Sequence, residues 1–230
     1  MSLFQPPQAN RLEQIRENLD RIRDGIEEAR LQYNRPPVRM MAVTKTVEPC
    51  YVNHAVALGV TLLGENRVQE FLSKREAYDP RAEIHMIGHL QTNKVRSIIP
   101  FVTAIESVDS LRLAEEINRI SARCNTVTDV FIEVNAGGEL SKSGVGFDQV
   151  PALLDGIKEL ANVRIKGLMA IPPIGAPDEI YQRLEECYQR ARENHHGMEV
   201  LSVGMSGDYA KAIRCGSNLV RIGTALFGNR

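Results

Sequence analysis

The sequence has 230 residues, of which 43% are hydrophobic, and this length is sufficient to bury a large core. We expect one barrel-sized domain over residues 1–230, with two smaller domains as the alternative. The 28 Lys and Arg residues nearly balance the 29 Asp and Glu residues, and no long basic run occurs, so we expect no nucleic-acid partner. The N-terminus lacks an apolar signal-peptide stretch and no eighteen apolar residues run together, which predicts a soluble, cytoplasmic protein without a membrane segment.

The segment from Arg11 to Tyr33 predicts one long amphipathic helix, because its apolar residues recur at steps of three and four. The same spacing fits a short coiled-coil seam, but it covers barely three heptads and contains Gly25. We therefore expect the stripe to pack on the chain's own core and the protein to be a monomer. The residues of this stripe are Leu12, Ile15, Leu19, Ile22, Ile26 and Ala29.

After Pro36 and Pro37, short apolar runs alternate with helical segments. The predicted strands cover roughly 38–44, 60–63, 83–87, 102–106, 128–134, 164–170, 198–203 and 218–222. The predicted helices between them cover about 48–58, 66–77, 92–98, 109–123, 148–160, 178–195 and 207–215. Aspartates that can cap free backbone N–H groups lie at or near several helix starts, namely Asp109, Asp148, Asp178 and Asp208.

Eight βα units after a leading helix predict a parallel sheet that closes into a single (β/α)8 TIM-type barrel. A doubly wound open sheet is the alternative. The barrel is favoured because the strand count is eight and because no strand is followed by G-x-G-x-x-G. Only "TALFGNR" follows the last strand, so we expect no second domain.

Polar and glycine-rich residues follow several predicted strands, and the carboxyl ends of strands are where such barrels place their sites. Strand one ends in Lys45, and strand two runs into Asn66. Strands seven and eight run into "SVGMSGDY" and "VRIGTALFG", where backbone N–H groups and the Ser206 hydroxyl could converge on a phosphate. Each glycine could equally be a simple turn residue, and Lys45 could be an ordinary solvated lysine.

Arg221 lies within the predicted eighth strand, so its side chain points either into the barrel or outward. In the barrel centre a charged group needs a partner, whereas on the outer face it would pair with a carboxylate of a helix. The spacing leaves both possibilities open.

Seven motifs, in order from strand one to strand eight, closely resemble those of the pyridoxal phosphate homeostasis protein family. They are "AVTKT", "GENRVQEF", "HMIGHLQTNK", "SKSGVG", "KGLMAIP", "LSVGMSGDYAKAI" and "GSNLVRIGTALFG". The resemblance covers almost the whole chain from Val38 onward. It implies a fold-type III barrel, similar to the barrel domain of alanine racemase, that carries pyridoxal 5'-phosphate (PLP) as a Schiff base.

The resemblance also implies how individual residues bind the cofactor. Lys45, in the motif's lysine position, would carry PLP, and an amine can condense with an aldehyde only when it is unprotonated. By the same similarity, Ser206, Gly223 and Thr224 would bind the phosphate.

Three further positions would surround the pyridine ring by this resemblance. Arg221 would face the ring nitrogen, while Asn66 and Met169 would lie beside the ring. An arginine opposite that nitrogen disfavours ring protonation and so weakens the electron sink that most PLP enzymes use.

The function that the resemblance implies is that of a PLP carrier or regulator of intracellular vitamin B6 pools, which also influences amino-acid and keto-acid balance. PLP-dependent apoenzymes are candidate recipients. Racemases of this fold type use a tyrosine from an additional β-domain of the partner subunit as a second acid/base. This chain ends at Arg230 without such a domain. We therefore expect no substantial turnover. The alternative is a small PLP-dependent amino-acid racemase or decarboxylase in which Lys45 and another rim residue transfer protons.

One further motif suggests a nucleotide-binding protein instead. The segment "AGGELSKSG" resembles G-x-x-x-x-G-K-[ST], with Lys142 and Ser143 at its end. However, Ala136 and Ser141 occupy the two glycine positions, and no helix obviously begins at Ser143. We therefore do not expect a nucleotide site.

The histidines and cysteines do not predict a metal site. His85 and His89 are four residues apart, but on a strand and its turn rather than on a helix, so a core or rim role is expected for each. His195 and His196 lie at the end of a predicted helix, where a partial positive charge is favourable. The four cysteines form no C-x-x-C pair, which predicts reduced thiols.

Overall fold

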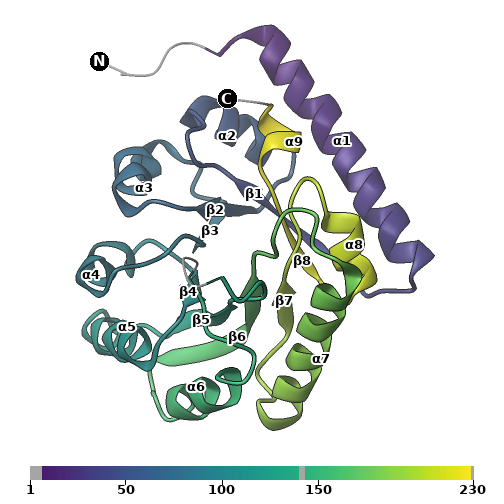
Figure 1. Cartoon of the computed structure of the whole chain (residues 1–230). Helices are drawn as coiled ribbons and strands as arrows, with labels where there is room; N and C mark the ends of the chain where they lie inside the picture. The colour runs from purple at the N-terminus through teal and green to yellow at the C-terminus, as the bar shows by residue number, and fades with distance from the viewer. Residues whose placement is uncertain (1–6, 140–142, 229–230) are drawn as a thin grey trace.

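The computed structural model describes residues 7–139 and 143–228, and within them eight parallel strands form a closed barrel (Figure 1). Each strand overlaps one predicted strand, so the predicted barrel, rather than the doubly wound open sheet, is the fold. The strands are β1 (Arg39–Val43), β2 (Leu62–Glu65), β3 (Glu83–Met86), β4 (Ala104–Val108), β5 (Thr128–Val134), β6 (Val163–Ala170), β7 (Val200–Ser202) and β8 (Leu219–Ile222).

Strand β1 closes the barrel because it pairs on both of its sides. Its Ala42 lies opposite Leu63 of β2, and its Met41 lies opposite Arg221 of β8, both in parallel register. Because the strands are parallel, their carboxyl ends all lie at one rim of the barrel.

Helices surround the barrel and follow the strands along the chain (Figure 1). The α-helices are α1 (Ala9–Gln32), α2 (Pro49–Ala57), α3 (Val68–Lys74), α4 (Val95–Ile98), α5 (Leu111–Arg123), α6 (Val150–Ile157), α7 (Asp178–Asn194), α8 (Tyr209–Arg214) and α9 (Thr224–Phe227). Two 3-10 helices, η1 (Arg75–Ala77) and η2 (Thr92–Lys94), extend α3 and precede α4.

Helix α9 and some helix starts differ from the sequence-based prediction. The sequence analysis predicted no helix at α9, because four residues are too few to show a helical period. At α5 the cap is Ser110, whose side chain accepts from the N–H of Leu113 at 3.4 Å, and Asp109 lies one residue earlier. Asp178 is the first residue of α7, and Asp208 is the N-cap residue of α8, as predicted.

The strands bury side chains on both faces, which is why they read as continuous apolar runs. Outward side chains such as Ala42 and Leu63 join the main core beneath the helices. Inward side chains form two smaller clusters inside the barrel. These clusters are Met41, Leu62, Ile87 and Leu219, and Ala104, Phe131 and Met169.

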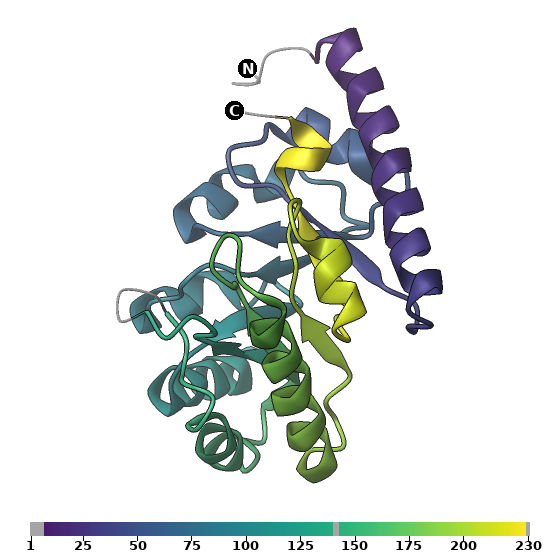
Figure 2. The ribbon, with the colours of Figure 1, turned by 45° about the vertical axis from the view of Figure 1, so that its right-hand side comes forward.

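The N-terminal helix α1 packs on the chain's own core, as predicted. Figures 1 and 2 both show it lying alongside α8 and α9, with which it shares residue contacts. The Asn18 side chain, which is buried, donates to the carbonyl of Leu226 in α9 at 3.1 Å. The buried stripe consists of Ile15, Leu19, Ile22, Ile26 and Ala29.

The cysteines are free thiols, as predicted, and none of them is paired. Among residues 7–139 and 143–228, no group of three His, Cys, Asp or Glu side chains is arranged to hold a metal ion. No helix in the same ranges has both the length and the apolar character required to cross a membrane.

Candidate functional site

Lys45 lies in a strained turn just beyond β1. The strand ends at Val43, one residue before the end of the predicted range 38–44, and Lys45 is half-buried at the rim. The next residue, Thr46, has a φ of 60°, which is unfavourable for a β-branched side chain. Its N–H donates to the Glu70 carboxylate of α3. Strain of this kind persists where the surrounding structure enforces it, and it often accompanies a functional site.

A buried carboxylate, Glu65, holds this turn against the neighbouring strand exit. Glu65 ends β2 and is fully buried. Its Oε1 accepts from Thr44 Oγ1 at 2.7 Å and from the Tyr78 hydroxyl. Burial raises the pKa of Glu65, and the hydrogen bonds from Tyr78 and Thr44 act in the opposite direction. Glu65 therefore links Thr44, the residue before Lys45, to Tyr78, the C-cap residue of η1, a role that the sequence analysis did not identify.

Asn66 directly follows β2 and carries a buried side-chain oxygen without a partner. Its Oδ1 accepts no hydrogen bond from the residues that the structure describes. The backbone around it is tight, because a Cβ at Gly88 would lie 2.1 Å from the Asn66 carbonyl oxygen. A buried polar atom without a partner is costly, so this oxygen is suited to a ligand donor.

Arg221 points into the barrel, which resolves the alternative left open by its spacing. Its Nη1 donates to the Ser202 carbonyl at 2.5 Å and to Ser202 Oγ at 2.7 Å, and its Nη2 donates to the Ala170 carbonyl at 2.7 Å. Ser202 Oγ in turn donates to Glu106 on β4, at 2.6 Å. Only the barrel interior connects these strands, so the outer-face reading is wrong.

Met169 lies on β6 at the level of this polar layer. It is fully buried and lies opposite Glu133 of β5 and Ser202 of β7 in the strand register. Its partners in the inner cluster are Ala104 and Phe131. Met169 therefore forms part of the apolar wall beside Arg221.

The loops after β7 and β8 meet at the N-terminus of α9. Ser206 Oγ accepts from the Ala225 N–H at 3.2 Å, and Gly223 is the N-cap residue of the helix. This contact brings Ser206, Gly223 and Thr224 together, as expected for one site. The first N–H groups of a helix have no intrahelical acceptor and can bind an anion.

The Ser206 loop owes its shape to Gly204 and Asp208. Gly204 has a φ of +100°, a conformation that glycine adopts without strain, and a Cβ there would lie 2.7 Å from that of Ala212. Asp208 Oδ1 accepts from the Met205 N–H at 2.6 Å, and its Oδ2 accepts from the Tyr181 hydroxyl at 2.6 Å. The loop therefore has a fixed form before any ligand enters.

The predicted site residues thus come from five strands that are consecutive around the barrel, β6, β7, β8, β1 and β2. Sequence reasoning did not identify the buried polar residues Glu106, Glu133 and Ser202 inside the barrel, and it expected only a core or rim role for His85. In the sequence, these residues stand out only as polar positions within apolar strands. Such a position indicates a buried polar side chain once it is known which residues of the strand face inward.

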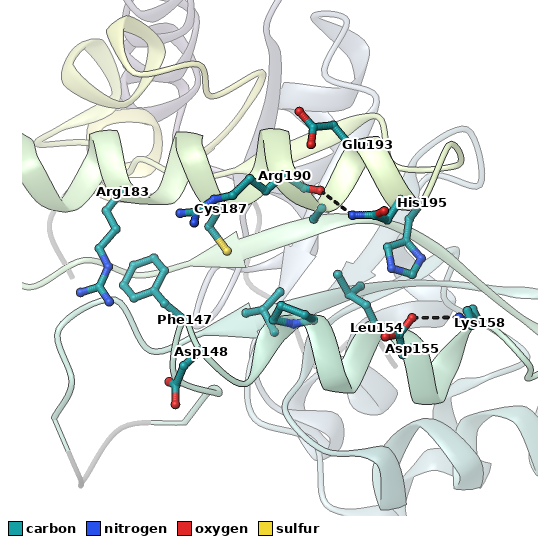
Figure 3. Close-up of a pocket in the computed structure, with 14 residues that line it drawn as sticks. Phe147, Asp148, Leu154, Asp155, Lys158, Arg183, Cys187, Arg190, Glu193 and His195 are labelled. Atoms are coloured by element: carbon teal, nitrogen blue, oxygen red, sulfur yellow. Dashed lines mark hydrogen bonds and ion pairs between the residues drawn. The ribbon is translucent and has the colours of Figure 1, made fainter.

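Two cavities differ in their relation to the predicted site residues. One of about 320 Å³ adjoins the Lys45 turn and α9, with Thr46, Gly223 and Arg11 among its lining residues. A larger one of about 750 Å³ lies outside the barrel between α6 and α7 (Figure 3). There Arg183 stacks on Phe147, at 4.2 Å from the ring centre. This outer groove contains none of the predicted site residues.

The motifs that we set aside have the expected structural roles. No helix begins at Ser143, since the next one starts at Val150, while Lys142 and Ser141 lie outside the described residues. His85 is a buried core histidine, and His89 is a rim histidine with more than half of its side chain exposed. His195 is the C-cap residue of α7.

The fold and the site define a (β/α)8 barrel with a candidate small-molecule site at its carboxyl-end rim. A family model described as "Alanine racemase, N-terminal domain" matches residues 12–230. The "Pyridoxal phosphate homeostasis protein" of Aquifex aeolicus is 40% identical over 227 residues, which cover 96% of this chain and 99% of that protein. The chain belongs to the pyridoxal phosphate homeostasis protein family, which confirms the family predicted from the seven motifs.

Two solved structures are also similar. A protein from Bifidobacterium adolescentis, described as an unknown protein, has 32% identity and a TM-score of 0.91, with 97% of this chain and 98% of that chain covered. PipY of Synechococcus elongatus, solved with PLP bound, has 30% identity and a TM-score of 0.80, with 93% of this chain and 100% of that chain covered.

Proposed function

We propose that this protein binds PLP at the carboxyl-end rim of its barrel and serves in intracellular PLP homeostasis and amino-acid and keto-acid balance. The observation that carries the proposal is the arrangement of three groups on consecutive strands: the Lys45 turn after β1, Arg221 inside β8 and the Ser206 contact with α9. The PLP-bound structure of PipY, a family member, supports the choice of ligand.

The residues fit the chemistry of PLP, which has an aldehyde, a phosphate and an aromatic ring with an acceptor nitrogen. When bound, PLP supplies an aldehyde that condenses with a lysine amine. Lys45, at the strained turn, would be the lysine that holds the cofactor. Ser206, Gly223 and Thr224 bind the phosphate through the Ser206 hydroxyl and the N–H groups at the start of α9.

The remaining three residues orient the ring. Arg221 would face the ring nitrogen. Both of its terminal nitrogens are bonded to strand acceptors, and its Nε–H has no acceptor among the described residues. Asn66 offers its unpartnered Oδ1 beside the ring. Met169 supplies an apolar contact from β6.

Arg221 also supports a carrier or regulator rather than an enzyme. A guanidinium fixed opposite the ring nitrogen would disfavour a protonated ring and would so weaken the electron sink that PLP supplies. We therefore assign no catalytic residue, and PLP-dependent apoenzymes are the proposed recipients of the cofactor. Incubation of the PLP form with L-alanine in deuterated water should give scarcely any Cα exchange by NMR. Rapid exchange that requires Lys45 would instead indicate a racemase or a related enzyme.

The absorption spectrum of the purified protein with PLP tests the binding proposal. We expect a visible band from lysine-bound PLP that Lys45→Ala abolishes. Lys211→Ala is a matched control, because the Lys211 ammonium is held by the Ala176 carbonyl at 2.9 Å and by Asp178 at 3.2 Å. The proposal is wrong if no band forms, or if the band survives Lys45→Ala and disappears in Lys211→Ala.

A further inference from the structure

A chain of buried side chains crosses the barrel beneath Arg221. The Glu106 carboxylate on β4 accepts from His85 Nδ1 on β3 at 2.6 Å and from Ser202 Oγ on β7 at 2.6 Å. Ser202 Oγ is also 2.7 Å from Arg221 Nη1. All four side chains are buried, and Glu106 and Ser202 have no exposed surface.

Glu106 is the anion among these hydrogen-bonded side chains. Burial acts to raise its pKa, but the hydrogen bond and electrostatic interaction with His85, together with the charge of Arg221, outweigh that effect and lower the pKa. A buried charge is stable only when it is paired and hydrogen-bonded, and both carboxylate oxygens have a donor. His85 is itself fixed, because it also packs against Phe131 with 5.9 Å between the ring centres.

The direction of the Ser202 hydroxyl depends on this carboxylate. A hydroxyl has one proton to donate and can accept with its lone pairs. Because the Ser202 proton goes to Glu106, the oxygen is left to accept from Arg221 Nη1. If Glu106 lost its charge, the hydroxyl proton could turn away, and Arg221 would lose a polarised acceptor.

We infer that Glu106 is a positioning residue that acts through Ser202 to hold the Arg221 guanidinium in one orientation toward the barrel mouth. The inference deepens the proposed function, on which its ligand part rests, because this orientation sets the affinity for a ligand with an aromatic ring nitrogen. The His85 hydrogen bond supports Glu106 from the opposite side.

The first test needs no cofactor. In the PLP-free protein, we expect the Nε–H of Arg221 to give a sharp, slowly exchanging NMR signal, assigned by its loss in Arg221→Lys. Glu106→Gln should broaden the signal or lose it to solvent exchange. Glu65→Gln is the matched control, since Glu65 is an equally buried strand carboxylate that contacts Thr44 and Tyr78 instead, and it should leave the signal unchanged.

Loss of the signal in Glu65→Gln as well would show a general effect of buried carboxylates and would overturn the inference. An unchanged signal in Glu106→Gln would also overturn it. If Glu106→Gln does not fold, Ser202→Ala decides the matter, because it removes the same hydroxyl without touching a charge. Its Arg221 signal should be lost too, and a wild-type signal there would contradict the inference.

The second test separates ring binding from phosphate binding. Glu106→Gln should weaken the equilibrium affinity for PLP by roughly tenfold, as expected for one charge-assisted hydrogen bond, and leave the affinity for inorganic phosphate within about twofold. Equal losses for both ligands, or none for PLP, would overturn the inference. If wild-type protein does not bind PLP at all, the proposed function fails, and the NMR test still decides the role of Glu106.

Discussion

Glu133 is a buried carboxyl group on β5 whose Oε2 has no partner among the residues that the structure describes. Burial and, to a smaller extent, the charge of Asp109 raise its pKa to about 7, while Arg221 acts to lower it. In the unfolded chain its pKa is near the ordinary value of 4.5. The folded protein therefore retains a proton that the unfolded chain releases between these two pH values.

This difference predicts how the stability of the PLP-free protein changes with pH. Because the folded pKa is raised, the stabilising contribution is complete below about pH 4.5 and is lost as pH rises through about 7. Glu133→Gln, which is neutral at every pH, should therefore gain stability relative to the wild type between pH 5 and pH 8. The gain should be on the order of 2 to 3 kcal/mol, measured by urea unfolding.

The control for this measurement is Glu83→Gln, which changes an exposed carboxylate at the start of β3. Its stability difference from the wild type should vary little over the same pH range. If the Glu133→Gln difference were also constant from pH 5 to pH 8, Glu133 would not bind its proton more tightly in the folded state.

At the scale of elements, the N-terminus of α9 and the Ser206 loop form the proposed phosphate subsite. Ser206→Ala removes one hydroxyl there, so it should weaken PLP binding by roughly three- to tenfold. Ser206→Ala and the wild type should bind pyridoxal, which lacks the phosphate, with the same affinity. Both proteins should bind pyridoxal far more weakly than the wild type binds PLP. Equilibrium titration of both ligands with both proteins measures this. An equal loss for pyridoxal and PLP would place Ser206 outside the phosphate subsite.

The elements that could be predicted from sequence are those with a clear period or a run of apolar residues. The stripe of α1 and the apolar strands predicted the barrel and its leading helix. Helix α9 could not be predicted, because its four residues become helical through Gly223 as N-cap and through burial of Leu226 and Phe227. Such a short helix depends on tertiary packing rather than on local propensity.

Candidate site residues could be proposed from the sequence where they follow strands and match family motifs, as Lys45, Asn66 and Ser206 do. The polar layer inside the barrel could not be proposed in this way. Glu106 and Ser202 come from strands on different sides of the barrel, and their 2.6 Å contact requires the closed register of the sheet. A polar residue within a strand signals a buried partner without identifying it.

For the molecule as a whole, we predict a monomer. The described barrel pairs β8 with β1, which removes the open sheet edges through which chains associate, and the α1 stripe is buried on the same chain. Light scattering at low and high protein concentration should therefore give one mass, that of a single chain. A dimer whose mass does not change with dilution would contradict this and would favour the coiled-coil alternative for α1.

The central claim is that Lys45 is the lysine to which PLP binds, and borohydride reduction followed by peptide mapping tests it most directly. Reduction fixes the cofactor on its lysine, so mass spectrometry of the digested protein identifies the residue. We predict a pyridoxyl group on Lys45 and none after Lys45→Ala. A pyridoxyl group on Lys211, or on Lys142 outside the described residues, with Lys45 unmodified would contradict the account.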